Sequence, residues 1–198
     1  MKTKSENVKY ETKDDSIEAY LAAPDDNDKH PGVIMIHEIF GLDEHTKNVA
    51  DRLAAEGYVV LAPHLFSSKK LSASLSSRNI ATAMKFMMSI PVDKQRDEQY
   101  RANELAKLDE EEKKAVTEVN QILFMNRPID LFVEYMSSGV DYLHSLPNVS
   151  EKIGSVGFCF GGGMSINLAC TGKTEYLVYH YDSRMFIIIV RGCEIRFY

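Results

Sequence analysis

The chain has 198 residues, 44% of them hydrophobic, which is enough to bury one substantial core and predicts a single domain over residues 1–198. Its formal net charge of -6 and the absence of a concentrated lysine and arginine stripe argue against nucleic acid as a partner. The N-terminus lacks the apolar core of a secretory signal, and no apolar run is long enough to cross a bilayer, so we expect no membrane partner.

The first half of the chain alternates strand and helix patterns. Residues 16–21 alternate polar and apolar side chains before a proline, as an edge strand would, and residues 32–36 form a continuous apolar run typical of a strand covered on both faces. Residues 46–56 carry an apolar helical face and are followed by Gly57, where a C-cap glycine belongs. A second buried strand at 58–62 completes a strand, helix, strand unit, which predicts a parallel crossover and an α/β fold.

The middle of the chain, from residue 72 to about 144, has mainly helical patterns. Within it, residues 94–125 are rich in charge and predict a helical excursion, either a solvated surface, a lid over a site, or a partner-binding segment. A further helix is expected to begin near Pro128 and to end near Pro147. Strand composition returns at 175–181 and again at 185–190, but the segment 172–198 ends without a terminal helix and is atypical of such a domain.

The most informative motif lies at residues 157–163. An apolar run at 152–156 predicts a buried strand, the glycines at 157 and 161 flank Cys159, and a helical pattern follows. This is the pattern of a nucleophile elbow, in which glycines remove Cβ atoms that would collide at a tight strand-to-helix turn. The backbone N–H of Phe160 and the helix N-terminus would then face the group that the sulfur attacks. The alternative interpretation is a glycine-rich loop with an inert, buried thiol.

Cys159 is one of three cysteines, with Cys170 and Cys193. An odd number of cysteines without metal-ligand spacing predicts free thiols, no metal site, and a reducing, cytoplasmic location.

A second motif, His37-Glu38-Ile39-Phe40-Gly41-Leu42, directly follows the buried strand at 32–36. Because the carboxyl ends of parallel strands meet at one edge of a sheet, we expect this loop to lie beside the elbow. Its position matches the loop that gives the second oxyanion-hole N–H in hydrolases with a nucleophile elbow. The alternative is that Glu38 is an ordinary exposed loop carboxylate.

Together these motifs resemble the dienelactone hydrolase family. Three segments stand in the family's order and register: His37 to Leu42, Val49 to Phe66, and Gly157 to Gly162, and the resemblance extends over residues 8 to 181. It implies an α/β-hydrolase-type three-layer sandwich with a mostly parallel sheet, and a cofactor-free enzyme acting on small ester or lactone substrates. It also implies that Cys159 is the nucleophile, that the N–H groups of Ile39 and Phe160 form the oxyanion hole, and that Glu38 contacts the resting thiol.

The chain departs from the family after the elbow. The family places an Asp and then a His on later strands, whereas here only His180 and Asp182 follow Cys159, in the reverse order. We interpret His180 as a strand-end histidine, and His37 and His64 do not occupy the family's position for the base. We therefore expect a C-terminally truncated hydrolase that is inactive or weakly active by itself. The alternatives are a non-catalytic binding or regulatory protein and a redox-sensing thiol protein. An arginine for a substrate carboxylate would come from Arg78 or Arg101, for each of which a solvated surface role is the simpler interpretation.

Overall fold

The computed structural model describes residues 1–174, 176–181, 184–191 and 194–197, with side chains described up to Thr174. The chain divides into two compact units, one formed by Met1–Ser68 with Ile129–Tyr198 and the other by Lys69–Pro128. That the two units together form the single domain expected from the sequence stays a prediction. The two sequence motifs, at residues 37–42 and 157–163, both belong to the first unit.

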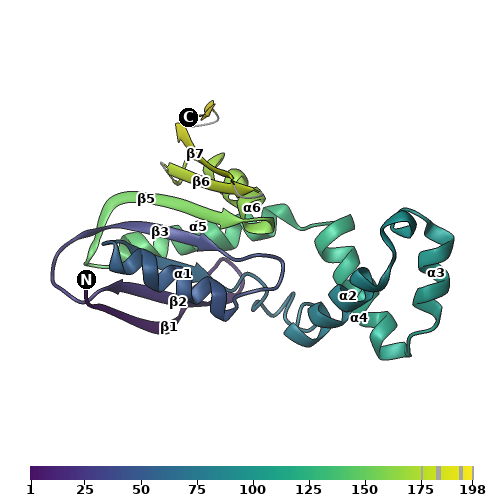
Figure 1. Ribbon diagram of the computed structural model, residues 1–198. Helices are drawn as coiled ribbons and strands as arrows, with labels where there is room; N and C mark the ends of the chain where they lie inside the picture. The colour runs from purple at the N-terminus through teal and green to yellow at the C-terminus, as the bar shows by residue number, and fades with distance from the viewer. Residues whose placement is uncertain (175, 182–183, 192–193, 198) are drawn as a thin grey trace. The chain divides into compact units, whose positions relative to one another are not determined.

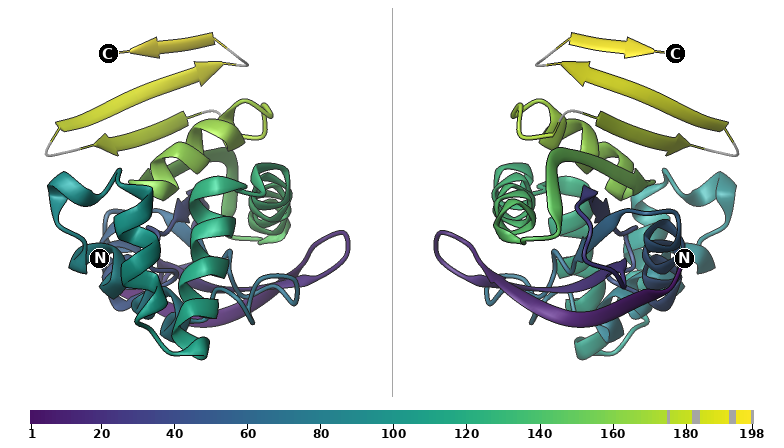
Figure 2. Two further views of the ribbon diagram at one scale, coloured as in Figure 1. Left: turned by 90° about the vertical axis from the view of Figure 1, so that its right-hand side faces the viewer. Right: turned by 90° about the vertical axis from the view of Figure 1, so that its left-hand side faces the viewer.

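The first unit is built on one sheet. In the described residues it has eight strands in the order β1-β2-β4-β3-β5-β6-β7-β8. Pairing is parallel between β4, β3, β5 and β6 and antiparallel toward both edges, and Figure 2 shows β6, β7 and β8 following one another at the C-terminal edge. The strands are β1 (Thr3–Glu11), β2 (Ser16–Pro24), β3 (His30–Ile36), β4 (Val59–Pro63), β5 (Val149–Phe158), β6 (Tyr176–Tyr181), β7 (Arg184–Arg191) and β8 (Glu194–Phe197).

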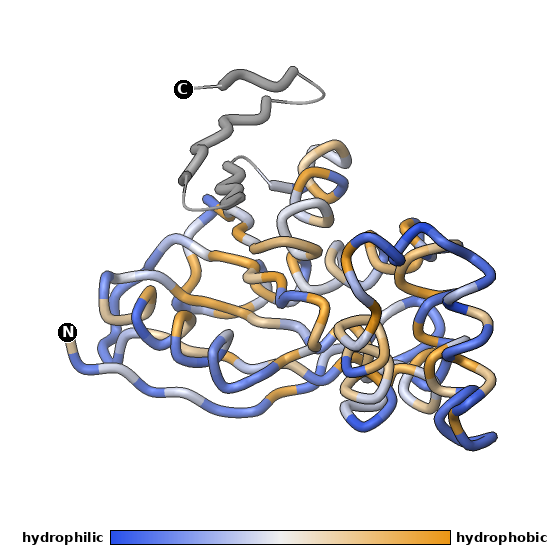
Figure 3. The backbone as a smooth tube through the Cα atoms, turned by 45° about the vertical axis from the view of Figure 1, so that its right-hand side comes forward, coloured by the Kyte–Doolittle hydropathy of each residue, from blue (hydrophilic) through white to orange (hydrophobic). Residues whose placement is uncertain are grey.

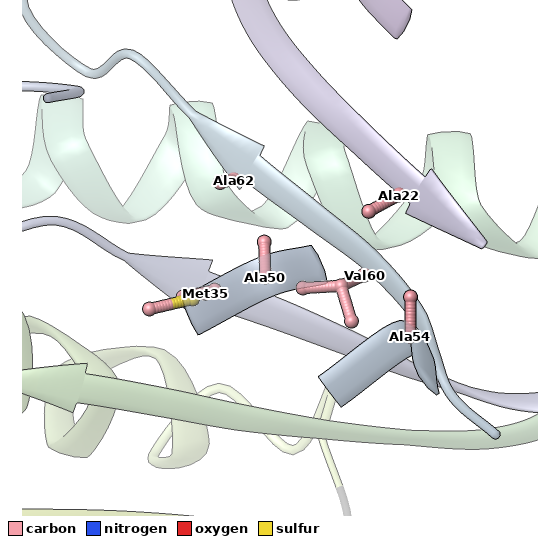
Figure 4. Packing of buried hydrophobic residues seen from close by; sticks show 6 residues of the cluster. All are labelled: Ala22, Met35, Ala50, Ala54, Val60 and Ala62. Atoms are coloured by element: carbon pink, nitrogen blue, oxygen red, sulfur yellow. The ribbon is translucent and has the colours of Figure 1, made fainter. Parts of the chain in front are cut away.

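Helix α1 (Glu44–Ala55) covers one face of this sheet. The sequence predicts it over residues 46–56, so it is confirmed with both ends shifted by one or two residues toward the N-terminus. The side chain of Asp43 caps its first turn by accepting a hydrogen bond from the Thr46 N–H at 2.8 Å, and Gly57 follows it with φ of 96°. Small residues allow α1 to lie close to the sheet, as Figure 4 shows for Ala50 and Ala54. The strand residues of the same cluster are Ala22, Met35, Val60 and Ala62.

The opposite face of the sheet is covered by α5 (Ile129–Ser145) and α6 (Phe160–Ala169), which also contact each other. Gly139 of α5 lies against Ile34, while the neighbouring Met35 faces α1, so successive residues of β3 are buried on opposite faces. The Tyr10 hydroxyl donates to the Tyr135 carbonyl at 3.0 Å. This hydrogen bond ties β1 to α5, the two elements labelled in Figure 1. The α/β-hydrolase-type three-layer arrangement and the doubly covered strand at 32–36 are confirmed.

One detail of the predicted sheet is wrong. Residues 16–21 were expected to form an edge strand, but β2 lies between β1 and β4, and β1 is the edge. Strand β1 gives little sequence signal because most of its side chains are exposed and Tyr10 is its one buried residue. A strand that buries so little apolar surface has no clear alternation to read.

The second unit, Lys69–Pro128, is helical, which agrees with the excursion expected within it. It contains α2 (Ser77–Ser89), η1 (Val92–Lys94), α3 (Glu98–Ala106), α4 (Glu110–Asn120) and η2 (Gln121–Met125), the last a π-helical turn. In Figure 3 hydrophobic and hydrophilic residues alternate along these helices, as in amphipathic packing. Helices α2 and α4 pack together, and Asp109 and Glu112 form a capping box at the start of α4.

Candidate active site

Cys159 occupies a strained turn between β5 and α6. Its φ of 53° and ψ of -113° make it the one non-glycine residue with positive φ among the described residues. A Cβ on Gly157 would overlap the carbonyl group of Gly161, so the turn closes only because both flanking positions lack side chains. The thiol of Cys159 is exposed at the N-terminus of α6. This is the nucleophile-elbow geometry, and a strained backbone of this kind, which costs about 1–3 kcal/mol, is often found at functional sites.

Gly161 joins the elbow to the end of β3. A Cβ on Gly161 would overlap the Ile36 carbonyl oxygen and would lie 2.7 Å from the His37 carbonyl oxygen. The parallel register of β3 and β5 pairs Ile36 with Gly157, so the residues that follow each strand leave the sheet at the same edge. The loop that begins at His37 therefore lies beside the elbow, as the two motifs predict.

The loop after β3 is closed by its own backbone. The Glu38 carbonyl accepts a hydrogen bond from the Gly41 N–H at 3.3 Å, and Gly41 has a φ of 86° that favours glycine. Glu38 and Ile39 are half-buried, and Phe40 is exposed. The backbone N–H of Ile39 has no acceptor among the described residues, so it can donate to a ligand.

His37 is the buried polar residue of this loop, with 1% of its surface exposed. Its Nδ1 lies 2.6 Å from the Glu38 carbonyl oxygen, and its Nε2 accepts a hydrogen bond from the Leu65 N–H at 3.1 Å. A carbonyl can only accept, so the ring is neutral with the proton on Nδ1. Burial lowers the pKa of His37 to about 4, which agrees with a neutral ring. Since both ring nitrogens are hydrogen-bonded to backbone groups, His37 is not available as a general base.

An aromatic cluster surrounds the His37 ring. The ring lies nearly parallel to that of Phe160, at 16° and 6.0 Å between centroids, and meets the edge of Phe66 at 4.7 Å. Phe132 packs against both Phe66 and Phe160. His64 borders the cluster, and burial lowers its pKa as well. The two hydrogen bonds of the His37 ring thus lie among apolar aromatic side chains, where a hydrogen bond is stronger than in water.

Of the other predicted residues, His180 comes near the elbow through its backbone, which pairs with Phe158 in the parallel register of β5 and β6. Its side chain and the whole of Asp182 lie outside what the structure describes. Arg78 belongs to the second unit, where it is ion-paired with Glu111 at 3.1 Å, and Arg101 lies on α3 of that unit. The described residues contain no group of three His, Cys, Asp or Glu side chains suited to a metal ion. None of their helices has the length and apolar character needed to cross a bilayer.

Comparison with known proteins agrees with this geometry. The sequence profile of the dienelactone hydrolase family matches residues 17–184, which is more than half of the chain. The chain belongs to the dienelactone hydrolase family. A protein of Saccharolobus solfataricus with the provisional name carboxymethylenebutenolidase is 35% identical over 174 residues, which cover 87% of this chain and 64% of that protein. A protein of Synechocystis with the same provisional name is 28% identical, over 74% of this chain and 46% of its own length.

Solved structures share the fold. The dienelactone hydrolase of Anabaena variabilis superimposes with a TM-score of 0.56 at 14% identity, over 90% of this chain and 63% of that one. A dienelactone hydrolase-like promiscuous phosphotriesterase from metagenomic libraries gives a TM-score of 0.55 at 21% identity, over 90% and 59%. The chain therefore spans less than two thirds of the length of these relatives.

The sequence does not predict the contacts of His37. Its motif indicates roles for Glu38 and Ile39, and leaves His37 outside the family's position for the base. One available signal was its place at the end of a doubly buried strand, where a polar side chain needs hydrogen-bond partners.

The close approach of Gly161 to β3 predicts a large difference between two alanine substitutions in one helix. Gly161→Ala places a Cβ against fixed backbone carbonyls and should destabilise the protein by about 1–3 kcal/mol, as overpacking does. Gly163→Ala, with nothing within 4 Å of the new atom, should be neutral or stabilising by up to about 1 kcal/mol. Urea unfolding measures both, and equal effects would contradict the packing described here.

The buried neutral His37 predicts a loss of stability in mild acid. Because its pKa falls from 6.5 when unfolded to about 4 when folded, its contribution is fully present above about pH 6.5 and is lost as the pH falls toward 4. The expected loss is on the order of 3 kcal/mol, at about 1.4 kcal/mol per pKa unit. The charged and titratable groups around the ring are His64 and Asp43.

The measurement compares the free energy of unfolding of the unmodified chain with that of His37→Gln between pH 7 and 4.5. Glutamine does not titrate, so the advantage of the unmodified chain should shrink as the pH falls, while other titrating groups act on both proteins. Curves that stay parallel over this range would show that His37 is not held neutral.

Proposed function

We propose that this chain acts on small ester or lactone substrates through an acyl-enzyme formed on Cys159, with the N–H groups of Ile39 and Phe160 as the oxyanion hole. One observation carries the proposal: the strained turn that presents the exposed Cys159 thiol is packed, through Gly161, against the carbonyls of Ile36 and His37, where the loop with Glu38 and Ile39 begins. Membership of the dienelactone hydrolase family supports the same chemistry.

In the proposed reaction the Cys159 thiol gives its proton to water, and the thiolate attacks the carbonyl carbon of the ester. A C–S bond forms, and the π electrons of the carbonyl move to its oxygen, where the two N–H donors stabilise the negative charge. Collapse of this intermediate breaks the bond to the leaving alkoxide, which takes a proton from water. Water then attacks the thioester, which releases the carboxylic acid and restores the thiol.

Glu38 is proposed to regulate the thiol. A carboxylate next to a thiol disfavours the thiolate, so Glu38 would keep Cys159 unreactive until a substrate displaces it. This role needs the loop to present the Glu38 side chain toward the elbow. Glu38 is half-buried and follows His37, whose carbonyl lies against Gly161 of the elbow.

Acylation and hydrolysis of the acyl-enzyme place different demands on the protein. Hydrolysis needs a base to activate water, and the one His and the one Asp that follow Cys159 in the sequence are His180 and Asp182. Esters with a good leaving group, such as p-nitrophenyl acetate, need no acid for the first step. We therefore expect rapid acylation of Cys159 followed by slow release.

The chain contains its own control for this test, since Cys159 and Cys170 are exposed thiols at opposite ends of α6. With p-nitrophenyl acetate the unmodified chain and Cys170→Ala should release a burst of p-nitrophenolate close to one equivalent, and Cys159→Ala should release none. Peptide mass spectrometry identifies the acylated residue and distinguishes it from Cys193. Equal acylation of Cys159 and Cys170 would favour a non-catalytic protein. A Cys159 that resists acylation but forms a sulfenic acid readily would favour a redox sensor.

The role of Glu38 predicts faster chemistry at the thiol when its charge is removed. Glu38→Gln should increase the rate of Cys159 alkylation by iodoacetamide at pH 7 several-fold, because the neighbouring negative charge is gone. Glu44→Gln, an equal change of charge in the exposed first turn of α1, is the matched control and should leave the rate unchanged. If both substitutions have the same effect, Glu38 does not guard the thiol.

A further inference from the structure

We propose that His37 is a positioning residue that holds both oxyanion donors, the N–H groups of Ile39 and Phe160, in place for the reaction at Cys159. This role rests on the proposed function. It differs from the roles that the resemblance implies, because His37 neither attacks the substrate nor moves a proton.

The first link runs from His37 to the Ile39 N–H. The carbonyl of Glu38 and the N–H of Ile39 belong to the same peptide group, and in a trans peptide they point in opposite directions. The described chain contains no cis peptide bond. The hydrogen bond of 2.6 Å from His37 Nδ1 to this carbonyl therefore fixes the orientation of the peptide plane, and with it the direction of the Ile39 N–H.

The second link anchors the ring itself. His37 Nε2 accepts from the N–H of Leu65, a fully buried residue just after β4. The imidazole is thus attached at both nitrogens to the backbone of two successive loops, those after β3 and β4. A ring held at two points cannot rotate about χ2 without losing both hydrogen bonds, so the Glu38 carbonyl is held by a fixed donor.

The third link runs to Phe160. The face of the His37 ring lies against that of Phe160, which is 5% exposed, and Phe66 closes the edge of the same ring. The ring contact limits movement of the first residue of α6, whose N–H is the second oxyanion donor. One buried side chain therefore touches the residues on both sides of the oxyanion hole.

Two reactions of the same sulfur separate positioning from mere structural support. Acylation by p-nitrophenyl acetate develops an oxyanion, whereas alkylation by iodoacetamide displaces iodide and develops none. A defect in the oxyanion hole slows only the first reaction. Damage to the fold or to the thiol slows both.

The experiment measures both rates at Cys159 in the full chain. His37→Phe keeps an aromatic ring against Phe160 but loses both hydrogen bonds, and should slow acylation about 10²-fold, within the 10²–10³ range of a lost oxyanion donor, with alkylation unchanged within about twofold. His37→Gln carries a donor and an acceptor on one amide and should recover most of the acylation rate. The matched control is His30→Phe, because His30 lies at the opposite end of β3 and also uses both ring nitrogens, with Gly57 and Asp26. It should change neither rate.

Three results would overturn the positioning role: acylation by His37→Phe at the unmodified rate, an equal fall of both reactions, or no recovery in His37→Gln. If the unmodified chain alkylates but does not acylate at Cys159, the proposed function itself fails and this role fails with it. Should His37→Phe not fold, ¹⁵N NMR of the unmodified chain decides, since the role requires a neutral ring protonated on Nδ1 at pH 7. A charged ring or a proton on Nε2 would overturn it.

Discussion

The site depends on a contact between two stretches of backbone. Gly161, in the first turn of α6, lies so close to the carbonyls of Ile36 and His37 that no side chain fits between them. This contact fixes α6 relative to the end of β3, and the register of β3 and β5 does the same from within the sheet. Because both partners are backbone, the distance does not vary with side-chain rotamers, which suits a site where donors must hold fixed positions.

The close approach of Gly161 to the end of β3 also constrains the two neighbouring segments, the turn at Cys159 and the loop from His37 to Gly41. Cys159 is two residues before Gly161 and takes up the strain of the turn in its own φ and ψ. The loop from His37 to Gly41 cannot spread over the elbow without losing the hydrogen bonds of the Glu38 carbonyl, which accepts from both His37 and Gly41. The rings of Phe66, Phe132 and Phe160 pack against one another, and Phe66 and Phe160 also contact the buried His37 ring. The hydrogen bonds of that ring therefore lie in an apolar environment, where they are stronger than in water.

The sequence was informative where the physical cause is local. Gly57 and the elbow glycines mark positions that require missing Cβ atoms, and the apolar run at 32–36 marks a strand covered on both sides, so these elements were predicted. Strand β1 was missed because its exposed side chains leave almost no pattern. The contacts of His37 were missed because they depend on Leu65 and Phe160, which are distant in sequence and become neighbours only in the folded sheet. Local rules cannot identify such partners.

The arrangement also separates the two halves of the proposed reaction along the chain. The groups that would hold and stabilise the acyl intermediate lie at residues 37–41 and 157–163, with Leu65 and Phe66 as their support, and all of them precede Thr174 in the described part of the first unit. A base that activates water would come from beyond the elbow, as in the family pattern. In the proposed reaction, formation of the acyl-enzyme and its hydrolysis would therefore depend on different segments of the chain. A leaving group that departs without a proton is then the right probe of the first segment, because its release reports the oxyanion hole and the thiol and does not require the base.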